Sequence, residues 1–222
     1  MEIEGRGFHT NLYSVRGNYS GGKEGKSKIQ WLRSMVGSPD LISIPGETGR
    51  MYEANVDDVG YRLVAIYTPI REDGVEGHPV SASTEPIAVE PDVLKEVKQK
   101  LDLGSVKFEA LRDKDKSSKK VSGEGGLERR ILEVNRKRVK VVKPGSKTSF
   151  PTTEIRGSYT PPFHVEIFGN DQHRLRIVVD SDSEVDLMVQ TRHLRDVIVL
   201  VIRGFAQKFN STSLNSLLKI DS

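Results

Sequence analysis

The chain has 222 residues, enough for one large domain or for two of about 100 residues each. Its 36% of hydrophobic residues can form a core, and the lack of cysteine excludes disulfides, thiolate metal sites and cysteine nucleophiles. The longest apolar run, VIVLVI at 197–202, is too short to span a membrane, so the sequence predicts a cytoplasmic protein.

Charge divides the chain into two parts. Residues 1–92 carry 9 Lys and Arg against 14 Asp and Glu, a net charge of −5, whereas residues 93–222 carry 25 against 17, a net charge of +8. Residues 111–147 alone hold 13 basic residues against 5 acidic ones. This asymmetry predicts two domains, 1–92 and 93–222, of which the second offers a surface to an anionic partner.

Short strands dominate the first domain. Alternating apolar positions predict strands at 14–19, 28–34, 41–44, 50–56, 61–67 and 80–89, with glycine-containing turns between them. One such turn, GGKEGKS at 21–27, resembles a phosphate-binding P-loop. Its first glycine is one position too close to the second and a strand follows it, so we expect a turn there and no nucleotide.

The strand with Trp31 and the segment DVGY at 58–61 together resemble an immunoglobulin-type (Ig) β-sandwich. We expect Trp31 to anchor the core and the alternating strand 61–67 to face it. Tyr61 stands one place earlier than in that family, and the family's cysteine pair is missing. The resemblance therefore implies the sandwich without its disulfide.

The second domain begins and ends with a predicted helix. Val93, Val97 and Leu101 are spaced four apart and predict a helix at 93–101, and an acidic start followed by helical spacing predicts another at 183–209. Between them we expect strands at 104–111, 127–134, 139–143, 162–169 and 173–180, with a polar loop at 112–126. This order resembles a pleckstrin-homology (PH) domain. The alternative for 197–202 is a strand.

The expected fold is mainly β: an Ig-like β-sandwich fused to a PH-like β-barrel, capped by a C-terminal α-helix. The stretches YSGGKEGKSKIQWLRS, VGYRLVAIYTPIREDGVEG and HLRDVIVLVIRGFAQKF resemble the Ig–PH region of the plant stomatal closure-related actin-binding protein family. The resemblance covers essentially the whole chain. It implies a fragment of a cytoskeleton-associated protein that binds, bundles and stabilises actin filaments. It also implies that the parent protein dimerises through coiled coils outside this region.

The inventory of reactive side chains predicts no enzyme. The five histidines lie far apart and form no metal-binding set such as HExxH, and no GxSxG nucleophile elbow occurs. Carboxylates at 57–58 and 180–182 fall where turn or helix capping explains them. We therefore expect no catalytic residue, no metal and no cofactor.

The basic stretch is the candidate binding site. PH domains that bind inositol phosphates commonly place a lysine near the first hairpin loop and a basic-x-Arg pair on one face of the second strand. Here that strand offers adjacent Arg129 and Arg130, which point to opposite faces, so the resemblance implies a displaced and weak site. The residues predicted to bind inositol phosphates or phosphoinositides are Lys116, Lys119, Lys120, Arg129, Arg136, Arg138 and Lys140.

Two other interpretations of this basic surface stay open. It is either the solvated surface of a rigid scaffold or a direct contact for acidic actin filaments. His173, Arg174 and Arg176 form a smaller basic patch on a later strand. Nucleic acid is not expected as a partner, because no recognition motif is present and few aromatic residues lie among the basic ones.

Overall fold

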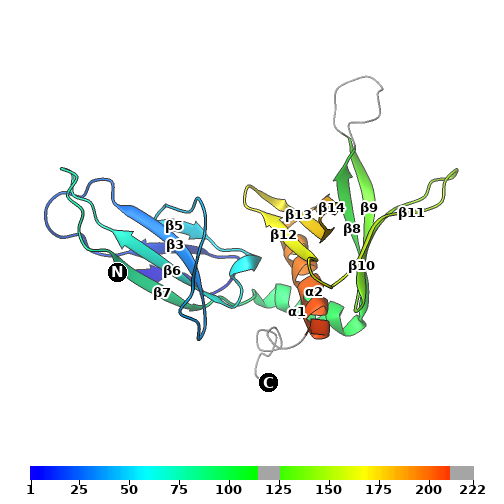
Figure 1. Cartoon of the computed structure of the whole chain (residues 1–222), viewed down its shortest axis with the longest axis horizontal. Coiled ribbons are helices and arrows are strands. Elements are labelled where there is room, and N and C mark those ends of the chain that lie inside the picture. Colours follow the sequence, from blue (N-terminus) through cyan, green and yellow to red (C-terminus); the bar gives the residue numbers. More distant parts are fainter. Residues whose placement is uncertain (115–125, 211–222) are drawn as a thin grey trace. The chain divides into compact units, whose positions relative to one another are not determined.

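A computed structural model describes residues 1–114 and 126–210 of the chain. The chain divides into two compact units, Met1–Pro91 and Asp92–Ser222. Both are built mainly from β-strands, as the sequence predicts, with two α-helices in the second unit (Figure 1).

The first unit is a sandwich of two antiparallel sheets. One sheet has the order β1-β2-β5 and the other the order β4-β3-β6-β7. The elements are β1 (Glu2–Glu4), β2 (Leu12–Arg16), β3 (Lys28–Met35), β4 (Leu41–Ser43), β5 (Met51–Glu53), the 3-10 helix η1 (Val56–Asp58), β6 (Tyr61–Thr68) and β7 (Val80–Pro86). Each strand predicted in this half is present with shifted ends, and β1 is an additional strand that the sequence did not indicate.

Trp31 anchors the core of this sandwich, as expected. Its ring is fully buried between the sheets and lies 5.4 Å from the ring of Tyr52. The indole N–H donates a hydrogen bond of 2.9 Å to the carbonyl of Gly49, so the polar atom of this large side chain is satisfied. Tyr13 packs into the same core, and its burial raises the pKa of its hydroxyl to about 12.

A buried carboxylate joins the two sheets. Asp58, which is fully buried in η1, accepts a 2.6 Å hydrogen bond from Arg33 Nε on β3 and a 2.9 Å hydrogen bond from the Tyr52 hydroxyl on β5. It also accepts a 2.8 Å hydrogen bond from the backbone N–H of Asn55. Burial, together with the Asp58 charge, raises the pKa of Tyr52 and keeps it a neutral donor. The first residue of the DVGY segment is therefore a structural acid.

The glycine-rich segment before β3 forms a loop between two strands, as predicted. Gly21 and Gly22 have positive φ angles of 106° and 115°, a conformation that favours glycine. The loop pairs with the segment after β6, where the Gly25 N–H donates to the Ile70 carbonyl at 2.7 Å. The glycines thus have a structural role in this turn.

The second unit has seven antiparallel strands and two helices. Its elements are α1 (Pro91–Leu103), β8 (Ser105–Asp113), β9 (Leu127–Asn135), β10 (Arg138–Lys143), β11 (Thr152–Ser158), β12 (His164–Phe168), β13 (Asp171–Asp180), β14 (Ser183–Met188) and α2 (Arg192–Asn210). The predicted helix at 93–101 and the predicted strands at 127–134 and 139–143 are confirmed with slightly shifted ends. The sequence did not indicate β11.

The strands follow a PH-like order but do not close into the expected barrel. Hydrogen bonding gives the open order β11-β10-β9-β8-β14-β13-β12, in which β8 meets β14 at Leu111 and Met188. β11 lies close to β13 without pairing with it. Gly157 makes this approach possible, since a Cβ there would lie 2.5 Å from Cγ1 of Val179.

The predicted C-terminal helix is present, but it begins later than expected. Residues 183–188 form the strand β14, because Val185 and Leu187 alternate as buried positions with more exposed acids between them. Helix α2 starts after Thr191, whose hydroxyl accepts a 3.1 Å hydrogen bond from the Leu194 N–H as an N-cap. The run 197–202 is helical and buried throughout, so the strand alternative is wrong.

α2 is the longest helix in the described part of the chain, and it packs against β9, β12 and β13. In Figure 1 it lies across the sheet of the second unit. Neither this helix nor any other described one has the length and apolarity needed to cross a bilayer.

Replacing Asp58 with Asn is expected to destabilise the first unit by about 3 kcal/mol, because it leaves the guanidinium of Arg33 without its buried counter-charge. Denaturant unfolding followed by fluorescence measures this selectively, since the single tryptophan, Trp31, lies in the first unit. Asp73→Asn is the matched control: it removes an exposed ion pair with Arg71 and should leave the transition nearly unchanged. If the two substitutions lower the free energy of unfolding equally, the hydrogen bonds of Asp58 do not hold the two sheets together.

Gly157→Ala should destabilise the second unit by about 2 kcal/mol, because its methyl group overlaps Val179 where β11 approaches β13. Gly169→Ala is the control, since a Cβ at that glycine has no heavy atom within 4 Å. Thermal unfolding followed by circular dichroism compares the two. A tolerated Gly157→Ala would mean that β11 does not need this close contact.

Candidate docking surface

The outer face of β8 to β11 carries a row of charged side chains. Strand register places Lys107 on β8 opposite Glu133 on β9, Glu133 opposite Lys140 on β10, and Lys140 opposite Arg156 on β11. Adjacent strands lie about 4.8 Å apart, so the four residues form a line across the sheet. Arg138 shares this face, two residues before Lys140 on the same strand.

One carboxylate serves several cations in this row. Glu133 lies 2.9 Å from Lys107 Nζ and 3.3 Å from Lys140 Nζ, and these hydrogen bonds, that of Lys107 foremost, lower the pKa of Glu133. Arg138 and Arg156 are exposed and have no ion pair within the described residues. We call Lys107, Arg138, Lys140 and Arg156 the outer basic face. Its positive charge exceeds what Glu133 balances.

The residues predicted from sequence do not all lie on this face. Arg138 and Lys140 do, and Arg136 lies in the adjoining turn, where its guanidinium approaches Gly104. Arg129 lies six residues from Asn135 along β9, about 20 Å from that turn, and forms an ion pair with Glu109. Lys116, Lys119 and Lys120 lie outside the described residues.

Two members of the outer basic face, Lys107 and Arg156, were missed in the sequence. The alternation of Val106, Lys107 and Phe108 contains the signal for Lys107, because its apolar neighbours point inward. Arg156 was missed because β11 was not predicted.

The inward side of β9 carries a different arrangement. Glu128 and Arg130 are two residues apart and share the inward face, so this strand has Glu-x-Arg where the inositol-phosphate pattern has basic-x-Arg. Arg130 is buried and donates to Glu154 at 2.7 Å and to Glu128 at 3.0 Å. Lys143 adds a 2.9 Å ion pair to Glu128.

These inward groups neutralise one another. Burial alone would raise the pKa of Glu154, but hydrogen bonds from Arg130 and Arg112 outweigh it and the pKa is lowered. The pKa of Glu128 is lowered chiefly by its hydrogen bond from Lys143. An anion that approached Arg130 would have to displace two carboxylates of the protein itself.

The smaller basic patch is neutralised as well. Arg176 forms a bidentate pair with Asp186 at 2.6 and 2.9 Å, and this contact raises the pKa of its guanidinium. Arg174 lies 2.8 Å from Asp113 and 3.0 Å from Asp171. This patch therefore has no excess of positive charge to offer a partner.

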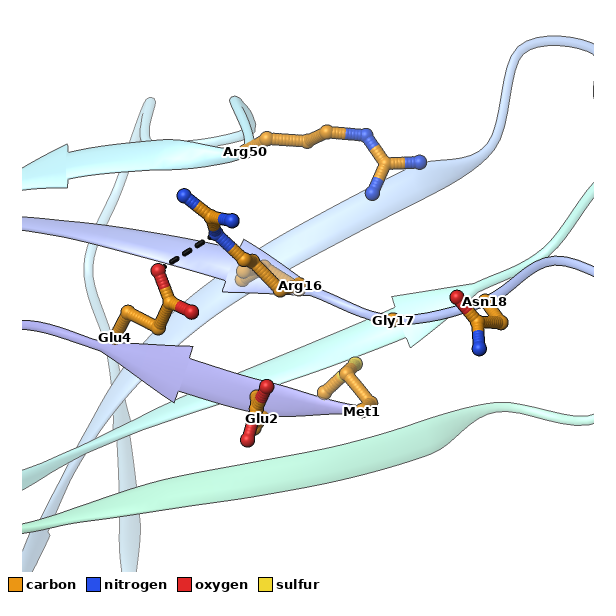
Figure 2. Close-up of a pocket in the computed structure, with 8 residues that line it drawn as sticks. Met1, Glu2, Glu4, Arg16, Gly17, Asn18 and Arg50 are labelled. Atoms are coloured by element: carbon orange, nitrogen blue, oxygen red, sulfur yellow. Dashed lines mark ion pairs between the residues drawn. The ribbon is translucent and has the colours of Figure 1, made fainter.

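The first unit has an open polar hollow of about 610 Å³ at its sheet edge. Figure 2 shows its lining side chains, among them Arg16 and Glu4, which are joined by an ion pair of 2.6 Å. Arg50, also in the lining, pairs with Glu24 at 2.7 Å. The basic groups of this hollow are thus matched by acids. Within residues 1–114 and 126–210, no group of His, Asp and Glu could hold a metal ion.

Comparison with known proteins identifies both units. The chain is 83% identical over all 222 residues to the 187-kDa microtubule-associated protein AIR9 of Arabidopsis thaliana, and it spans 13% of that protein's length. This relative is a plant protein that is named for microtubules, and not for the actin filaments or the stomatal closure that the sequence resemblance implied. Residues 1–84 match the AIR9 A9 domain, an Ig-like domain, and residues 113–209 match the AIR9 PH-like domain. The chain therefore carries an AIR9 A9 domain followed by an AIR9 PH-like domain.

Proposed function

We propose that this chain is a non-enzymatic interaction module of a cytoplasmic, microtubule-associated protein, and that its outer basic face binds the acidic surface of microtubules. The observation that carries the proposal is the row of Lys107, Lys140 and Arg156 around the single carboxylate of Glu133. The name of the relative supports microtubules as the polymer. We also propose that the first domain comprises residues 1–92 and the second domain residues 93–222.

The contrast with the other basic groups supports this choice of surface. Arg129, Arg130, Arg174 and Arg176 each have at least one carboxylate partner within 3.0 Å. A charge that is already paired contributes little attraction at a distance, whereas unpaired surface charge raises the rate of association with an oppositely charged partner. On the outer basic face, positive charge is left over within the described residues.

Inositol phosphates are the second candidate ligand. Arg138 and Lys140 lie on one face two residues apart, and Arg156 opposes Lys140 on the next strand, so three cations are near enough to approach one phosphorylated ring. The self-neutralised Glu128-x-Arg130 pair favours this displaced position over the inward one. The same charges also suit actin filaments, which makes actin a third arm of the test.

The double substitution of Lys140→Glu and Arg156→Glu should weaken co-sedimentation with microtubules by roughly tenfold at low ionic strength, because it inverts the charge of the face. Lys26→Glu with Lys95→Glu changes the net charge equally at two other exposed lysines and should have little effect. Glu133→Gln should strengthen binding roughly threefold, since it removes the one balancing acid. A gain of affinity cannot come from loss of folding.

Parallel titrations separate the candidate partners. If neither the Lys140→Glu, Arg156→Glu double substitution nor Glu133→Gln changes microtubule binding, the proposal fails. If these two variants alter pelleting with actin filaments but not with microtubules, actin is the partner. If inositol hexakisphosphate shifts the amide signals of Arg138 and Arg156 while neither polymer binds, the ligand is an inositol phosphate.

A further inference from the structure

The loop between β10 and β11 displays an aromatic side chain to solvent. Phe150 is 91% exposed, more than any other large apolar side chain of the described residues, and Leu103 follows at 73%. Figure 1 shows that β10 and β11 extend away from the rest of the sheet and carry this loop at their end. Neither candidate ligand of the outer basic face requires such a residue.

The exposure of Phe150 is built into the loop. Ser146 and Ser149 close a tight turn through two backbone hydrogen bonds, of 3.0 and 3.4 Å, and their hydroxyls lie 2.9 Å apart. Gly145 packs beneath this turn, since a Cβ there would lie 2.5 Å from the Ser149 carbonyl oxygen. Pro151 follows Phe150 directly and restricts it to extended backbone conformations. The turn therefore cannot easily fold Phe150 back onto the sheet.

The charge around Phe150 is positive. Residues 144–153, PGSKTSFPTT, contain no Asp or Glu, and their one ionisable side chain is Lys147 at the tip of the turn. Lys147 has no ion pair within the described residues. Serine and threonine supply the other polar side chains of this segment, and their hydroxyl groups are compatible with the polar headgroup region of a bilayer. An aromatic group beside an unpaired cation suits the interface of an anionic bilayer.

We propose that Phe150 inserts into the interface of anionic membranes and that Lys147 contacts the lipid headgroups. A protein partner is the less suitable occupant, because the core of a protein interface needs a larger desolvated apolar cluster, and this loop offers one aromatic ring among hydroxyl groups. A bilayer needs no complementary socket. Binding through one aromatic ring and one lysine is weak and reversible, so it acts alongside other contacts of a larger protein.

Phe150→Trp provides the direct test. Trp31 is buried and gives a constant background, so the fluorescence of the new indole should shift to shorter wavelength with vesicles of phosphatidylcholine and phosphatidylserine. Leu103→Trp is the control at another exposed apolar position of the same unit and should not shift. Phe150→Ala should reduce vesicle co-sedimentation of the otherwise unchanged chain at least about tenfold. Lys147→Glu should reduce co-sedimentation with the vesicles that contain phosphatidylserine, and not with vesicles of phosphatidylcholine alone.

Other outcomes would overturn the proposal. If Phe150→Trp shows no shift with these vesicles, the loop does not insert. If it shifts equally with soluble inositol hexakisphosphate, the ligand is a headgroup and not a bilayer. If it shifts with microtubules and not with vesicles, the partner is a protein. Lys140→Glu with Arg156→Glu should retain the vesicle shift of the Trp variant, which keeps this inference independent of the outer basic face.

Discussion

The buried carboxylate of Asp58 is the interaction on which the first unit depends. It receives Arg33 from one sheet, Tyr52 from the other and a backbone N–H from the connecting segment. Two sheets without a disulfide are held together by apolar packing, which is not directional, and so a polar tie fixes their register. The cost of burying the charge is offset because both carboxylate oxygens accept hydrogen bonds, one from Arg33 and the other from Tyr52 and the Asn55 backbone.

In the second unit, the distribution of paired and unpaired charge decides where a partner can bind. Arg130 on the inward side of β9 and Arg176 on β13 are both positively charged, but each is neutralised by a carboxylate from another strand, Glu154 and Asp186 respectively. In the row across β8 to β11, by contrast, Glu133 alone pairs with Lys107 and Lys140, and Arg138 and Arg156 have no ion pair within the described residues. The high net charge of this half of the chain is therefore a poor guide by itself, and the register of the strands shows which part of that charge is available.

Sequence reasoning succeeded where a single period was clear. The alternation of Leu63, Ala65 and Tyr67 identified β6. The four-residue spacing of Val93, Val97 and Leu101 identified α1. It failed for β14, because Val185, Met188 and Val189 fit a helical spacing as well as a strand. β11 was missed because its inward positions include Gly157, whose place in the core is filled by Val179 from another strand. The sequence around a glycine does not show that a side chain from a distant strand fills the space beside it.

For the candidate site, the sequence located the charge but not its geometry. Arg138 and Lys140 could be paired from their spacing alone, whereas their neighbours Lys107 and Arg156 come from strands more than fifteen residues away on either side. Arg129 belongs to the same basic stretch but lies at the far end of its strand beside Glu109. Residues that are close in the sequence were therefore wrongly grouped into one site when they lie at opposite ends of a strand.

The open edge of the second unit's sheet has a consequence for solubility. Among the described strands, β11 has a hydrogen-bonded neighbour on one side only, and such a strand is a template for pairing between copies of a protein. Arg156 stands in the middle of this strand, and Pro151 precedes its first residue. Like charges opposed across two such edges repel, so the arginine that we propose as part of the docking surface also protects the molecule from self-association. Any change that weakens the edge charge would make concentrated solutions of the protein prone to aggregation.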